Sequence, residues 1–153
     1  MTLLLSFLIG CLAGLRSFTA PAVTAWAARL GWLSLERPLA LIGSIPAVVI
    51  LTAIAMVELI ADKSPTMPNR TERRGLAARI ATGGITGACV AMAGAQPALV
   101  GAVLGSLGGV VGCFGGFQLR TRLVKALHTP DIVVALAEDV IAMVGCWWIV
   151  SRF

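Results

Sequence analysis

The chain has 153 residues, of which 58% are hydrophobic and only 12% are charged. Soluble domains contain about 25% charged residues, and one small core could not bury this many apolar side chains, so we predict a polytopic membrane protein with a single domain over residues 1–153. The net charge of +5 does not indicate nucleic-acid binding, because most Lys and Arg residues fall in short breaks between apolar segments, as they do in membrane proteins.

The first apolar segments predict a broken or re-entrant hairpin at the start of an all-α fold with about five spans. Residues 2–15 are too short, at about 1.5 Å per residue, to cross an apolar core of ~30 Å. Arg16 follows, and then a segment with Pro21 near its start, so we expect a second short helix within residues 17–33. Such a break is tolerated where protein or a wet cavity satisfies the freed backbone groups. The alternative is that residues 17–33 cross fully, which would move the N-terminus to the other side.

Longer apolar segments complete the predicted fold. Residues 38–61 can span, with a kink expected at Pro46. Two glycine-rich spans, a short basic interfacial helix and a closing span are then expected, at residues 76–95, 97–117, 119–128 and about 131–150.

The basic residues predict the orientation of these spans. Five Lys and Arg residues lie in the loop region 62–79 and three in 118–130. With five crossings the two regions share one side of the membrane, and the positive-inside rule makes that side cytoplasmic.

A weak internal duplication is also visible. The stretches CLAGLR (residues 11–16) and CFGGFQ (residues 113–118) share Cys, Gly and an apolar residue at matching offsets. The halves would be residues 1–63 and 97–153, inverted by the extra span at 76–95. Inverted repeats are typical of transporters, although apolar segments can also resemble one another by chance.

Glycines spaced four residues apart form a ladder in the apolar segment 97–117. Its members are Gly101, Gly105, Gly109, Gly108, Gly112 and Gly116. Small residues at this spacing let helix backbones approach closely. We interpret the ladder as helix packing, within a monomer or across a homodimer, and a sliding surface for alternating access is compatible with it.

Carboxylates inside apolar segments are the main candidates for a functional site. Glu138 lies eight residues beyond Pro130, about 12 Å along a helix, and Asp139 is adjacent. Glu58 and Asp62 are four residues apart and would share a helix face. Carboxylates at this depth usually face the bundle interior, paired with a cation or lining a wet path.

Arg16, at the break of the first hairpin, is the best candidate for that cation, with Arg120 and Lys63 as second choices. Two interpretations remain open. The charges form either a fixed ion pair that holds the broken helices, or a site for a proton, an ion or an anionic substrate built from Glu138, Asp139, Arg16, Glu58 and Asp62.

The break itself offers a candidate anion pocket. Free N–H groups at a helix start attract anions, and Ser17 and Thr19 add hydroxyls beside Arg16. Thr19 is expected to cap a helix that begins near Pro21, and capping alone would also explain these residues. No metal-ligand cluster, cofactor motif or catalytic set is recognisable, which disfavours an enzyme.

Three stretches together resemble a known family: GLRSFTAP (residues 14–21), ELIADKSP (58–65) and PDIVVALAEDVIA (130–142). The chain is similar, over nearly its whole length, to an uncharacterised family of small bacterial integral membrane proteins that is catalogued as a domain of unknown function. The resemblance implies a bacterial origin, and hence the inner membrane, and a single multi-pass domain. It supplies neither a reaction nor a substrate.

These features lead to two functional hypotheses. The first is a small transporter or lipid-handling translocase, with proton coupling through the carboxylate and arginine centre. The alternative is a membrane scaffold or assembly partner in which the ion pairs are structural. The expected partners are membrane lipids and a small ion, proton or anionic substrate.

Overall fold

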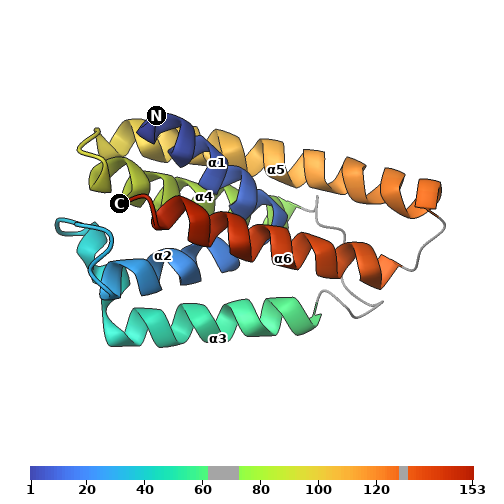
Figure 1. Ribbon diagram of the computed structural model, residues 1–153, viewed down its shortest axis with the longest axis horizontal. Coiled ribbons are helices and arrows are strands. Elements are labelled where there is room, and N and C mark those ends of the chain that lie inside the picture. The colour runs from blue at the N-terminus through green and yellow to red at the C-terminus, as the bar shows by residue number, and fades with distance from the viewer. Residues whose placement is uncertain (62–72, 128–130) are drawn as a thin grey trace.

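In a computed structural model, the described part of the chain, residues 1–61, 73–127 and 131–153, consists of helices joined by short non-helical segments and contains no strand (Figure 1). The elements in chain order are α1 (Thr2–Leu15), α2 (Thr19–Arg29), the 3-10 helix η1 (Leu39–Gly43), α3 (Ile45–Ala61), α4 (Arg73–Ala93), α5 (Ala98–Leu127) and α6 (Asp131–Val150). The predicted all-α class is therefore confirmed.

Three helices in the described residues are long and apolar enough to cross a membrane. They cover Gly75–Ala93, Ala98–Ala126 and Ile132–Val150. α1 and α3 are apolar but shorter, with 14 and 17 residues. Long apolar helices in a chain this poor in charge indicate a membrane protein. Of the five expected spans, the remaining two would have to come from α3 and from the α1–α2 pair.

The break between α1 and α2 lies where the sequence predicts it. Arg16 leaves the helical conformation, with φ −136° and ψ 113°. α1 runs from the N-terminus toward the middle of the bundle, and α2 runs back toward the same end (Figure 1). α2 begins at Thr19, with Phe18 as its N-cap and no side-chain cap, so the prediction that Thr19 caps this helix is wrong. Pro21 is tolerated because the first N–H groups of a helix have no intrahelical partner.

Two further helix boundaries differ from the prediction. Pro46 is the second residue of α3, where a missing N–H has no effect, so it does not kink a long span over residues 38–61. Instead η1 precedes α3 as a separate element. The expected separate helix over residues 119–128 is wrong as well, because α5 continues to Leu127. At 30 residues α5 is about 45 Å long, and its C-terminal part extends beyond its neighbours (Figure 1).

The closest helix packing in the described residues joins α1, α4 and α5. A Cβ on Gly105 would meet the backbone oxygen of Gly83 in α4, and a Cβ on Gly112 would meet that of Cys11 in α1. The ladder thus has two sides. Gly101, Gly105 and Gly109 lie against α4, whereas Gly108 and Gly112 lie against the backbone of α1 and Gly116 against the side chain of Leu15.

The two halves of the expected repeat have different local structure. Residues 11–16 end at the α1–α2 break, whereas residues 113–118 lie inside the continuous helix α5. The inverted repeat stays a prediction.

Candidate functional site

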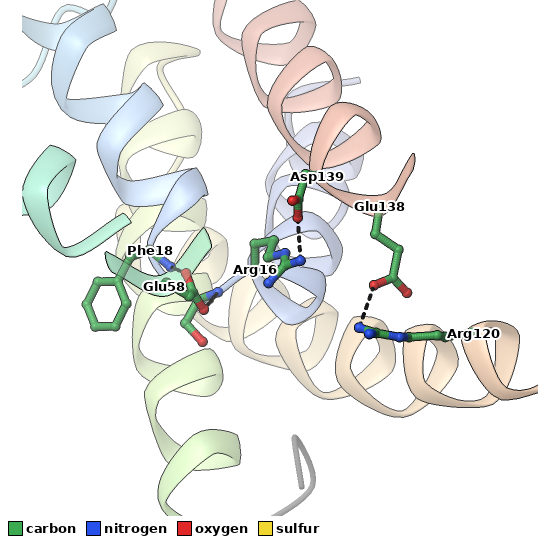
Figure 2. Close-up of polar contacts among 7 residues, drawn as sticks. Arg16, Phe18, Glu58, Arg120, Glu138 and Asp139 are labelled. Carbon is green, nitrogen blue, oxygen red and sulfur yellow. Dashed lines mark hydrogen bonds and ion pairs between the residues drawn. The ribbon is translucent and has the colours of Figure 1, made fainter. Parts of the chain in front are cut away.

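Charged side chains from three other helices gather around the α1–α2 break (Figure 2). Arg16 stands at the break, Glu58 comes from α3, Arg120 from α5, and Glu138 and Asp139 from α6. The structure therefore brings together four of the five carboxylate and arginine residues predicted for the site. The fifth, Asp62, lies outside the described residues, as does Lys63.

Arg16 forms an ion pair with Asp139. Its Nη2 contacts Oδ1 of Asp139, although the two atoms make no well-directed hydrogen bond. Arg16 is 0% exposed and Asp139 7%. Removing two charges from water costs several kcal/mol per ion, and the attraction between them offsets this only when both partners are present. The pair therefore ties the broken hairpin to α6.

Glu138, the neighbour of Asp139, has a different partner. Its Oε2 lies 3.6 Å from Nη1 of Arg120 in α5, and Glu138 is also buried, at 8% exposure. Successive helix residues point about 100° apart, so the two adjacent carboxylates reach cations on different elements. The sequence predicts Arg16 as the partner of both carboxylates. In the structure Asp139 pairs with Arg16 and Glu138 pairs with Arg120.

Glu58 holds the backbone at the start of α2. Its Oε1 accepts a hydrogen bond from the Ser17 N–H (2.8 Å), and its Oε2 accepts one from the Phe18 N–H (2.9 Å). N–H groups at a helix start have no intrahelical partner and carry a partial positive charge, which a carboxylate stabilises. The anion at this helix start is thus a side chain of the protein itself, 40 residues further along the chain from Phe18.

Residues 3–151 of the chain match the sequence model of one protein family, which is described as "Domain of unknown function (DUF4126)". The protein belongs to the DUF4126 family. This match confirms the resemblance seen in the sequence, and the family's description names no reaction or ligand. No curated protein and no solved structure matches the chain. For this DUF4126 protein the geometry of the site therefore has to carry the functional argument.

The hydroxyls proposed for an anion pocket also lie at the break. Ser17 and Thr19 are buried, at 5% and 6% exposure. Ser17 contributes its backbone N–H to Glu58. Oγ1 of Thr19 has no hydrogen-bond partner among the described residues. The same described residues contain no group of three or more His, Cys, Asp and Glu that could hold a metal ion.

Arg79 is a buried cation that the sequence analysis missed. The orientation argument counts it among the basic residues of the region 62–79, although the predicted span 76–95 also includes it; in the structure it lies in α4 and is 5% exposed. Its Nη1 lies 3.9 Å from Sγ of Cys113 in α5, and its backbone oxygen would be 2.6 Å from a Cβ on Gly109. Its apolar neighbours, in the stretch LAARIA, were the available signal that it lies within a helix.

The hydrogen bonds that Glu58 accepts from the Ser17 and Phe18 N–H groups lead to a specific prediction. Glu58→Gln should lower the free energy of unfolding by about 1–3 kcal/mol, because the amide NH₂ would face a backbone N–H and leave it unsatisfied. Amide hydrogen exchange at Ser17 and Phe18 should also become faster. Glu36→Gln is the matched control, since Glu36 is exposed. Equal unfolding and equal exchange in the two variants would show that Glu58 does not hold the break.

Proposed function

We propose that this protein is a small transporter or lipid-handling translocase of the bacterial inner membrane, with its functional site at the α1–α2 break. The observation that carries the proposal is the fully buried Arg16, paired with Asp139 in the middle of an apolar bundle. Apolar residues of similar size often stabilise a protein as well as a buried ion pair does. Ionisable residues at membrane depth are therefore typical of ion and substrate pathways.

The polar contacts that join the α1–α2 break to α3 and α6 support a conformational change there, because each of them depends on a carboxylate. Asp139 joins the break to α6, and Glu58 joins it to α3. A proton on Asp139 would neutralise the partner of Arg16, and a proton on Glu58 would remove one acceptor from the start of α2. In this proposal either event loosens the broken hairpin, and an anionic group of the substrate then takes the place of a carboxylate.

The membrane arrangement that fits this proposal has a re-entrant α1–α2 pair and four crossing helices. α3 would cross together with the three longer helices, and the regions 62–79 and 118–130 would face the cytoplasm. The basic residues Arg120, Arg122 and Lys125, near the C-terminal end of α5, support this orientation.

One observation favours the alternative of a scaffold or assembly partner. Glu58, Glu138 and Asp139 each have a partner within the chain. If these contacts never exchange, the charges only hold helices together. A homodimer would then use surfaces other than the ladder glycines that contact α1 and α4.

The two functions differ in what neutralising one carboxylate should do. We expect wild-type protein in liposomes to move protons, read by an enclosed pH-sensitive dye, or to flip a fluorescent phospholipid between leaflets. Glu138→Gln should fold and reduce that flux to the level of empty liposomes, while Glu36→Gln, on the exposed residue, should behave as wild type. Wild-type flux no greater than that of empty liposomes in either assay, or a destabilised Glu138→Gln with normal flux, would favour the scaffold.

A further inference from the structure

A cavity of about 360 Å³ lies beside the α1–α2 break. Phe18 and Pro21 line it at the start of α2, Leu39 and Ile42 line it from η1, and Leu51 from α3. Figure 2 shows the Phe18 ring turned away from Arg16 and Asp139. The Phe18 backbone therefore lies in the polar centre, whereas its ring lines an apolar cavity.

The lining predicts a hydrocarbon ligand. Thr82 of α4 is the polar residue of the wall, and its hydroxyl donates to the Ala78 carbonyl at 2.9 Å. A polar ligand would need a few convergent polar groups, and the described wall offers no uncommitted side chain of that kind. The volume is at the lower end of the ~300–1,000 Å³ range of ligand pockets, and well above the ~150 Å³ that holds benzene. It suits a length of one hydrocarbon chain and is too small for a whole phospholipid.

The charge at the edge of the cavity indicates what the hydrocarbon is attached to. Pro38 lines the cavity and is exposed, so the cavity reaches the surface there. Arg37 precedes it and is exposed, and so is Arg29 at the end of α2. η1 packs against that end, since a Cβ on Gly43 would lie 3.2 Å from the Arg29 backbone nitrogen. Arg37, next in sequence to the cavity-lining Pro38, offers a guanidinium group that is complementary to a lipid phosphate, and Arg29, on the helix end against which η1 packs, offers a second.

The geometry points to a phospholipid site in which one acyl chain fills this cavity and the phosphate lies at Arg37. The site goes beyond the proposed function and holds whether or not the polar centre transports anything. The acyl chain packs against Phe18, whose own N–H is held by Glu58. A bound lipid thereby braces the start of α2 from the side opposite the ion pair.

The test uses phosphatidylglycerol that carries a photoreactive diazirine on one acyl chain, added to the purified full-length protein. Labelled peptides are then mapped by mass spectrometry. We expect labelling within residues 39–51, and its loss in Ile42→Trp, which fills the cavity. Leu99→Trp is the matched control, because Leu99 is 76% exposed, and it should leave this labelling unchanged. Arg37→Gln should weaken the preference for phosphatidylglycerol over phosphatidylcholine about fivefold, the effect of one cation near an anionic lipid.

Two results would overturn the site. Labelling of residues 39–51 that persists in Ile42→Trp would mean that the lipid only covers the outer surface. Absence of that labelling, with a dimer in solution that Ile42→Trp dissociates, would assign the cavity to a second copy of the chain. If Ile42→Trp does not fold, Leu51→Phe fills the same cavity with a smaller change and is read in the same way. The labelling experiment measures lipid binding and not flux. A negative result would therefore reject this lipid site without bearing on the flux assay of the proposed function.

Discussion

Replacing Arg16 with Met should lower the free energy of unfolding by about 3–5 kcal/mol, because Asp139 would keep its buried charge without this partner. Arg16 is 0% exposed and Asp139 only 7%, so water cannot take the place of the guanidinium without opening the bundle. Titration with a denaturing detergent, followed by the loss of helical circular dichroism, measures the change.

The control for Arg16→Met is the double variant Arg16→Met/Asp139→Leu. It removes both charges and leaves apolar side chains of similar size, an exchange that is often neutral or stabilising for a buried pair. We expect its unfolding free energy to lie within about 1 kcal/mol of the wild type. A double variant as unstable as Arg16→Met alone would show that the two residues are not coupled.

Gly112→Ala should destabilise the protein by about 1–3 kcal/mol, the usual cost of overpacking a well-packed interior. The new Cβ would meet the backbone oxygen of Cys11, so α1 would have to move away from α5. Gly115 lies three residues along the same helix, and a Cβ added there would meet no neighbouring atom within 4 Å. Gly115→Ala should therefore stabilise by about 0.5–1 kcal/mol through helix propensity.

The difference between these two alanine variants is the informative quantity. Both replace a glycine in the same helix, so propensity contributes equally and cancels. Thermal unfolding in the same detergent measures both. Equal stabilities for Gly112→Ala and Gly115→Ala would contradict the close approach of α1 and α5 at this position.

Local signals in the sequence were sufficient for the first helix and for the break. The predicted segment 2–15 coincides with α1, because Arg16 ends a continuous apolar run and Pro21 marks a new start. Boundaries that depend on a position within a helix were less predictable. In the sequence, Pro46 lies within a long apolar run and predicts a kink. In the structure it lies in the first turn of α3, where a proline is tolerated.

The pairing of charges could not be derived from the sequence. α3 is apolar on nearly every side, and α5 near Arg120 carries basic residues on several sides, so no periodic pattern shows which way Glu58 and Arg120 point. The role of Glu58 depends on α3 lying next to the start of α2, a contact between residues 40 or more positions apart. Arg79 falls where the region 62–79 and the predicted span 76–95 overlap, and the sequence does not show which of them holds it, because basic residues are common at such boundaries.

We propose that the ion pair at the break takes part in transport and does not only hold helices together. The most direct test is flux in liposomes through the stable double variant Arg16→Met/Asp139→Leu, measured beside the wild type for both protons and phospholipid. We expect a folded, stable protein whose flux equals that of empty liposomes. Wild-type flux through this variant would show that the two charges are dispensable for function and that the ion pair is only structural.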